Sequence, residues 1–177
     1  MKNFIKNLIF VIIFFVIQMG FSNIFSIGWV LNLLGTFLII AVWTNNHSII
    51  KNQIIPSAIL VDLMQSSRFP ILTVTLLGIW LVVSIVENQW FTNHSGASLF
   101  GLALIGEAVR IFFTWSLIGL AYLLNFSNTR PNSTWFTKQI ITIALIEIIL
   151  VFFGGIFARW FSKKVIQKFS YGSAQSI

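Results

Sequence analysis

All four acidic side chains of this sequence lie inside or at the edge of strongly apolar segments: Asp62, Glu87, Glu107 and Glu147. A carboxylate in hydrocarbon is costly, so we expect each of them to face a protein interior, a partner or trapped water. The 177 residues are 57% hydrophobic and only 8% charged, whereas a soluble domain usually carries about a quarter charged residues. A soluble core cannot hide this much apolar surface. The sequence therefore predicts one compact, multi-pass integral membrane protein.

The sequence contains six apolar runs: Leu8–Phe25, Ile27–Thr44, Ile54–Met64, Ile71–Val86, Leu99–Leu124 and Gln139–Phe161. The eleven residues of the third run make about 16 Å of helix, short of the roughly 30 Å hydrocarbon core. Extending this run back to Ser48 adds Lys51 and Gln53, which we place at the membrane interface. We predict an all-α fold, a six-helix bundle with a short third helix.

The placement of the basic residues decides between six and five membrane spans. If the third run crosses, both termini are cytoplasmic, with seven basic residues inside and three outside. The inside set is Lys2, Lys6, Lys51, Arg159, Lys163, Lys164 and Lys168, and the outside set is Arg68, Arg130 and Lys138. If the third run does not cross, there are five spans, and six basic residues lie inside against four outside. Because cytoplasmic segments carry the excess of Lys and Arg, the distribution favours six spans with cytoplasmic N- and C-termini.

A near-repeat gives a second indication of the topology. Trp43–Ser48 and Trp90–Ser95 are nearly the same segment, 47 residues apart. In the six-span arrangement both follow an even-numbered helix and face the cytoplasm. One interpretation is an internal duplication. The other is that Asn, His and Ser recur because they are common turn and N-cap residues.

The end of the last apolar run divides the chain into two parts. Residues 1–161 are predicted to form a single polytopic membrane domain, whose first run is an uncleaved helix rather than a signal peptide. Residues 162–177 are predicted to form a basic, amphipathic cytoplasmic tail at the headgroup boundary. The net charge of +7 includes the basic group around this tail, which indicates contact with anionic membrane lipids rather than with nucleic acid.

The most informative polar residues are Glu107 and Arg110 in the fifth run. They are three residues apart, so they share a helical face and can form an ion pair. Such a pair is either a substrate-anchoring or proton-coupled site, or a structural contact that fixes how this helix packs. Glu147 is isolated in an apolar run and needs a partner on another helix. We expect Arg110 to serve both carboxylates if the fifth and sixth helices are adjacent.

Asp62 precedes a turn that ends with Arg68, Phe69 and Pro70. The helix should stop near Ser67, because the proline excludes the preceding residue from the helical region, and Pro70 can open the next helix. Asp62 is either a polar hinge at this turn or a carboxylate close enough to the helix end to reach interfacial water. Glu87 ends the fourth run beside polar residues, so we expect its side chain to be solvated.

The residue types present exclude several classes of chemistry. There is no cysteine and there are only two histidines, His47 and His94, so we expect no disulfide and no metal site. No nucleophile–base arrangement, phosphate-binding loop or catalytic pair of carboxylates is visible in the sequence. We therefore expect a non-enzymatic protein without a cofactor.

The segment Ile54–Ser116 resembles the rod shape-determining MreD family. Ala58–Pro70, a small-residue helix with Asp62 followed by a short polar turn and a proline, is similar to one element of that family, and Phe91–Ser95 with the apolar helix after it is similar to a later one. The resemblance implies a scaffold or regulator of cell-wall elongation and cell shape in the bacterial inner membrane. It implies as partners an MreC-like protein, a RodA-type glycosyltransferase and a penicillin-binding protein.

The resemblance also implies a fold akin to the substrate-binding subunits of energy-coupling factor importers. Those subunits are small six-helix proteins that bind a vitamin in an outward-facing cavity, so they supply the alternative function. In the scaffold, Asp62, Glu107 and Arg110 would hold the bundle in one arrangement. In the importer subunit, Glu107 and Arg110 would line a ligand pocket.

Overall fold

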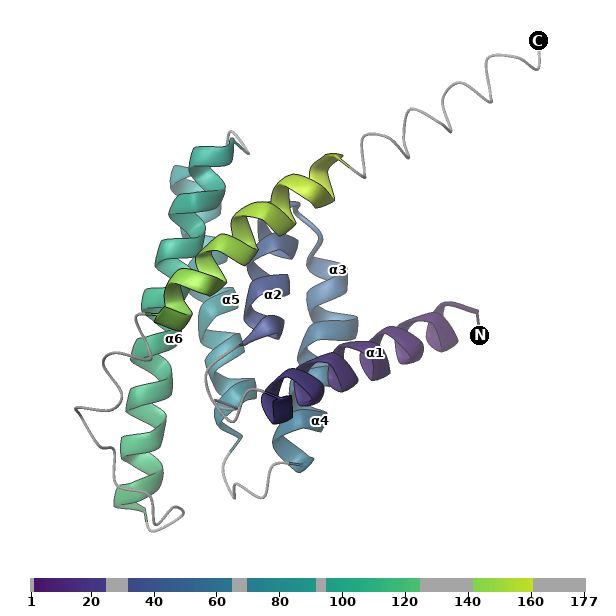
Figure 1. Cartoon of the computed structure of the whole chain (residues 1–177), viewed down its shortest axis with the longest axis vertical. Helices are drawn as coiled ribbons and strands as arrows, with labels where there is room; N and C mark the ends of the chain where they lie inside the picture. Colours follow the sequence, from purple (N-terminus) through teal and green to yellow (C-terminus); the bar gives the residue numbers. More distant parts are fainter. Residues whose placement is uncertain (1, 25–31, 65–69, 92–94, 125–141, 161–177) are drawn as a thin grey trace.

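The computed structural model describes residues 2–24, 32–64, 70–91, 95–124 and 142–160. These residues are almost entirely helical, with no strand among them (Figure 1). The labelled elements are α1 (Lys2–Ile24), α2 (Leu33–Trp43), α3 (His47–Ile49), the π-helical turn η1 (Ile50–Ile54), α4 (Ile55–Met64), α5 (Ile71–Trp90) and α6 (Gly96–Leu123). One more helix, Thr142–Trp160, follows α6 and is called the last helix. The predicted all-α fold is confirmed for this part of the chain.

Three of the described helices are long and apolar enough to cross a membrane by length and composition: α5 with 20 residues, α6 with 28 and the last helix with 19. Two shorter apolar helical stretches, Phe4–Gly20 and Leu33–Trp43, accompany them. Each of these five lies within or largely overlaps one of the predicted apolar runs. The predicted helical residues 25, 27–31, 139–141 and 161 lie outside the described part of the chain.

The third helix extends beyond its apolar run. Its apolar part is the short helix α4, with 10 residues, which matches the run Ile54–Met64. Because α3, η1 and α4 follow one another without a break, the polar residues before this run are helical too, and the helix begins at His47, one residue before the extension to Ser48. The whole helix His47–Met64 has eighteen residues and is about 27 Å long at a rise of 1.5 Å per residue. Ile50 and Ile54 at the two ends of η1 are fully buried and anchor this polar stretch to the core.

Hydrogen bonds join α1 to the helix His47–Met64. Gln53 Nε2 donates to Asn7 Oδ1 at 3.2 Å, and Ser57 Oγ donates to the Val11 carbonyl at 3.2 Å. These two contacts join the first half of α1 to η1 and the start of α4, and Figure 1 shows α1 lying across this helix.

The remaining helices are also ordered by pairs of contacts. Gly78 of α5 faces the Phe113 ring of α6, while Val83 lies beside Gly106, so these helices are antiparallel. Ile39 of α2 also lies against Gly106. The helices α5 and α6 are long, and Figure 1 shows them side by side.

The last helix packs antiparallel to α6 as well. Gly155 contacts Leu99 near the start of α6, and Glu147 contacts Arg110 further along it. The described helices from α2 onward therefore alternate in direction along the chain. The helix His47–Met64 and α6 run one way, and α5, the last helix and α2, whose Trp43 contacts Ser98 while Ile39 contacts Gly106, run the other way. Helix α1 lies across them (Figure 1).

Helix α2 lies at the centre of this arrangement. Eight of its 11 residues are buried, and it contacts α1, η1, α5 and α6. Its core side chains include Leu34, Leu38 and Val42, which are at most 1% exposed. Large apolar side chains on the outer helices are exposed instead, among them Leu81, Phe112 and Phe153. The hydrophobic residues thus fill the centre of the bundle and also cover its outside.

Candidate functional site

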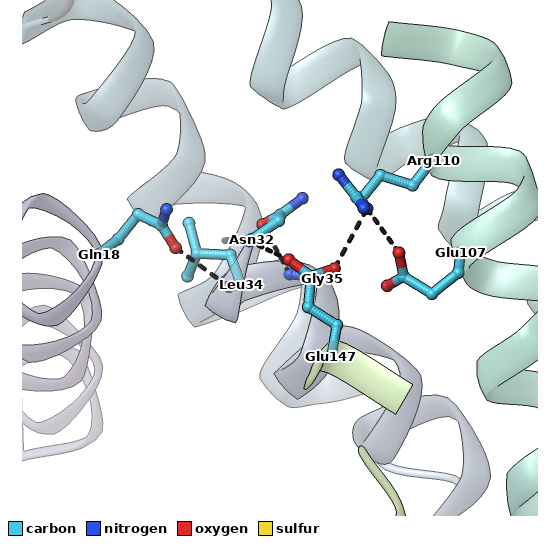
Figure 2. Close-up of polar contacts among 7 residues, drawn as sticks. All are labelled: Gln18, Asn32, Leu34, Gly35, Glu107, Arg110 and Glu147. Atoms are coloured by element: carbon cyan, nitrogen blue, oxygen red, sulfur yellow. Dashed lines mark hydrogen bonds and ion pairs between the residues drawn. The ribbon is translucent and has the colours of Figure 1, made fainter. Parts of the chain in front are cut away.

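The first turn of α2 begins inside the bundle, where its free backbone N–H groups need partners. Asn32 is the N-cap residue, and its side-chain oxygen accepts a hydrogen bond from the Gly35 N–H at 2.9 Å. The Leu34 N–H donates to Gln18 Oε1 of α1 at 3.3 Å. The Asn32 N–H donates to Glu147 Oε1 of the last helix. Figure 2 shows Gln18 and Glu147 approaching this helix start from different neighbouring helices.

Glu107, Arg110 and Glu147 come together beside this helix start (Figure 2). The Arg110 Nε–H donates to Glu107 Oε2 at 2.7 Å, as the spacing of three residues on α6 led us to expect. The same nitrogen lies 3.1 Å from Glu147 Oε2. The exposed fractions of Glu107, Arg110 and Glu147 are 5%, 5% and 1%. Arg110 therefore joins two carboxylates from two helices in a site closed to solvent by the protein itself.

We call this group, made up of Gln18, Asn32, Glu107, Arg110 and Glu147, the buried polar cluster. It connects four helices: α1 through Gln18, α2 through Asn32, α6 through Glu107 and Arg110, and the last helix through Glu147. The start of a helix carries a partial positive charge of roughly half a unit, so a carboxylate at that position is favourable. Removing one partner of a buried ion pair costs about 3–5 kcal/mol, and the cluster therefore strongly favours this one arrangement of the helices.

Two members of the cluster, Gln18 and Asn32, were not selected as site residues from the sequence. Both are amide side chains within otherwise apolar runs. That isolation is the signal that could have found them, because an uncharged polar group in an apolar helix also needs an internal partner. Thr36, one turn into α2, is buried as well.

Asp62 lies apart from the cluster, at the turn between α4 and α5. Its Oδ1 accepts the Leu72 N–H at 3.1 Å, and its Oδ2 accepts the Thr73 N–H at 2.7 Å and the Thr73 hydroxyl at 2.6 Å. Asp62 is only 7% exposed. Asp62 thus caps the first turn of α5 from the preceding helix. Asp62 is therefore engaged by protein donors at this turn, and the polar-hinge interpretation stays a prediction.

Glu87 differs from the prediction made for it. We expected a solvated side chain near the end of the fourth span, but Glu87 is buried, at 7% exposure. Helix α5 continues past it to Trp90, so the residue lies one turn inside the helix rather than at its end. The polar neighbours Asn88 and Gln89 are exposed. The prediction placed Glu87 in water with them, but its side chain lies on the buried face of α5.

Three helices end in a tryptophan at the same end of the bundle. Helices α2, α5 and the last helix run in the same direction and end at Trp43, Trp90 and Trp160. The Trp43 Nε1–H donates to Ser98 Oγ at 3.2 Å, and the Arg159 guanidinium lies 5.7 Å from the Trp43 ring centre. The two repeated segments follow α2 and α5 and so begin at this same end. Residues 92–94 of the second segment lie outside the described part of the chain.

Within the described residues, no group of three or more His, Asp or Glu side chains is placed to hold a metal ion. The predicted tail, residues 162–177, lies outside this part of the chain. Comparisons with protein-family models, with curated proteins and with solved structures find no match to the chain.

Proposed function

We propose that this chain is a six-span integral membrane protein of the bacterial inner membrane, with both termini in the cytoplasm, that works as a non-enzymatic scaffold. Three helices are long and apolar enough to cross a bilayer, and the helix His47–Met64 approaches the thickness of the hydrocarbon core. The alternation of helix directions from α2 to the last helix supports five successive crossings, and the proposal adds α1 as the first. An even number of crossings leaves both termini on one side.

The side of the membrane is proposed from the tryptophans and the basic residues. Tryptophan is enriched at membrane interfaces and Lys and Arg are enriched on the cytoplasmic side. The end with Trp43, Trp90 and Trp160 also carries Arg159, and the basic tail follows it in sequence. We therefore assign this end to the cytoplasmic interface.

The scaffold role is carried by one observation: Arg110 lies between Glu107 and Glu147, and these charged side chains contact one another across two helices. Such contacts hold the bundle in one arrangement. The exposed apolar side chains of α5, α6 and the last helix then present a fixed surface to lipid tails and to helices of partner proteins. Close packing between helices is the main source of association inside a bilayer.

The specific role in cell-wall elongation rests on the resemblance of Ile54–Ser116 to the MreD family. In that role the protein joins an MreC-like protein, a RodA-type glycosyltransferase and a penicillin-binding protein in one membrane complex. Asp62, which falls in the resembling segment, would keep the α4–α5 turn in the form that the partners recognise.

A test combines function with contact. The chain is produced in a rod-shaped bacterium depleted of its own MreD-family protein. A photoreactive amino acid replaces Phe112 or Phe153, which are exposed, and in the control it replaces Leu38, which is buried. The proposal predicts restored rod shape and crosslinks to the MreC-like or RodA-type partner from the exposed positions only. Round cells and no such crosslink would refute the role in elongation.

A second candidate is the substrate-binding subunit of an energy-coupling factor-type importer. One observation favours it: α2 starts inside the bundle and directs its N-terminus at charged groups, as the broken helices of transporters do at their substrate sites. Mass spectrometry of metabolites bound to the purified protein separates the two functions. A vitamin bound at one molecule per protein chain would refute the scaffold function and support the importer subunit.

A further inference from the structure

The formal charges of the buried polar cluster do not balance. Glu107 and Glu147 each carry one negative charge when ionised, and Arg110 carries one positive charge, while Gln18 and Asn32 are neutral. One negative charge is therefore in excess in a site where all three ionisable residues are at most 5% exposed. The start of α2 offers only a partial positive charge of about half a unit, and an uncompensated buried charge is strongly destabilising.

The hydrogen bonds identify the oxygen at which this excess is located. An arginine Nε carries a single hydrogen, and that of Arg110 is directed at Glu107 Oε2. Glu147 Oε2 is close to the same nitrogen, at 3.1 Å, but it accepts no hydrogen bond from the described residues. The other carboxylate oxygen of Glu147 is engaged by the Asn32 N–H. One buried acceptor is thus left beside a second carboxylate.

We propose that the buried polar cluster is a proton-binding site. One proton from water binds to Glu147 Oε2 and is shared with the Glu107 carboxylate, so that one carboxylate becomes a carboxylic acid and the cluster becomes neutral. The acid O–H then supplies the hydrogen bond that the single Nε hydrogen of Arg110 cannot give to both carboxylates. This proposal does not depend on the scaffold role.

In the part of the chain that the structure describes, the hydrogen bonds and ion pairs of the two cluster carboxylates involve no titratable residue besides Glu107, Arg110 and Glu147. On the last helix the other charged group is Arg159, which lies twelve residues further on beside Trp43. On α1 and α2 the groups that face the cluster are Gln18 and Asn32, which do not titrate. Helix α5 carries one carboxyl group, that of Glu87, which is four residues after Val83. Since Val83 lies beside Gly106 and the two helices are antiparallel, Glu87 lies on the side of this contact away from Arg110.

The proton has a consequence for the assembly of the bundle. Glu147 is on the last helix, and its two oxygens contact α2 and α6. Loss of the proton at alkaline pH leaves the excess negative charge buried, so the last helix is then held less firmly. Stability that depends on this site is present while the proton is bound and is lost as the pH rises.

Infrared spectroscopy of the purified full chain in lipid nanodiscs tests the proposal. A protonated carboxyl group gives a carbonyl band separate from that of carboxylates, and the band shifts in deuterium oxide. The wild type should show this band at neutral pH. Glu107→Gln and Glu147→Gln should each abolish it, because the remaining carboxylate then balances Arg110. Glu87→Gln, a buried carboxyl outside the cluster, should retain it.

Thermal unfolding gives a second reading of the same variants. The wild-type midpoint should fall from neutral to mildly alkaline pH, whereas the midpoint of Glu107→Gln should stay constant over that range. If Glu107→Gln does not fold, Glu147→Gln provides the same comparison, and the wild-type band is measured in any case. The absence of an acid band in the wild type would overturn the proposal. A band that persists in both cluster variants, or midpoints that fall in parallel, would overturn it too.

Discussion

At the scale of single residues, the sequence was informative wherever a charge is isolated in an apolar run. The spacing of Glu107 and Arg110 predicted their contact, and the isolation of Glu147 predicted a partner on another helix. The two amides of the cluster, Gln18 and Asn32, were missed, because a neutral polar side chain is less conspicuous in sequence than a charge. Glu87 was misjudged because its exposed neighbours do not reveal which face of α5 it occupies.

Arg110 and Glu147 are predicted to act as a coupled pair. Arg110→Ala should lower the free energy of unfolding by about 3–5 kcal/mol, since it leaves buried carboxylates without a cation. In a Glu147→Gln background the same substitution should do less harm, because one carboxylate fewer is left unpaired. Unfolding midpoints of the four proteins in detergent measure this difference. Lys6→Ala, at an exposed position outside the cluster, is the control, and fully additive losses would argue against the coupling.

At the scale of helices, apolar runs predicted where most helices lie but not where each one ends. The third helix begins at His47 because polar residues before Ile54 extend it through η1. The apolar run alone does not mark this start, although the extension of the run back to Ser48 comes within one residue of it. The helix α2 starts at Leu33, later than its apolar run begins. Its start depends on Gln18 and Glu147, which come from distant parts of the sequence. Such long-range capping is fixed by the fold and is not visible in a local pattern.

The cap that Asp62 provides predicts a local loss of stability. Asp62→Ala removes the acceptor of two backbone N–H groups and one hydroxyl at the start of α5, and should cost about 1–3 kcal/mol. Asp62→Asn keeps one oxygen acceptor and should cost less. Hydrogen exchange of the first turn of α5 measures the effect directly. Equal exchange in the wild type and in Asp62→Ala would contradict the capping role.

The packing of α5 against α6 predicts a contrast between two glycines. A Cβ added at Gly78 would lie 2.8 Å from the Phe113 ring, whereas one added at Gly119 would meet nothing within 4 Å. Gly78→Ala should therefore be the more destabilising, because the Phe113 ring must shift to make room for the added methyl group. Gly119→Ala should be neutral or stabilising by up to about 1 kcal/mol through helix propensity. Both are compared by unfolding midpoint, and a larger loss at Gly119 would refute this packing.

At the scale of the whole molecule, composition alone pointed to a membrane protein, and the alternation of helix directions is the structural feature that bears on its topology. The directions follow from contacts between residues far apart in sequence, such as Gly78 with Phe113. The buried polar cluster accounts for Glu107, Arg110 and Glu147, and the cap at the start of α5 accounts for Asp62. The sequence alone left five and six spans open, because the third apolar run is shorter than the helix that contains it.

The measurement that most directly tests this account is the sidedness of single cysteines, since the chain has no cysteine of its own. A cysteine is introduced at Ser48, Arg130 or Ile177 and treated in intact cells with a thiol reagent that does not cross the inner membrane. Six spans predict labelling of Arg130→Cys only, with Ser48→Cys and Ile177→Cys labelled after the cells are opened. Labelling of Ile177→Cys in intact cells, while a cysteine at Lys2 stays protected, would contradict the account.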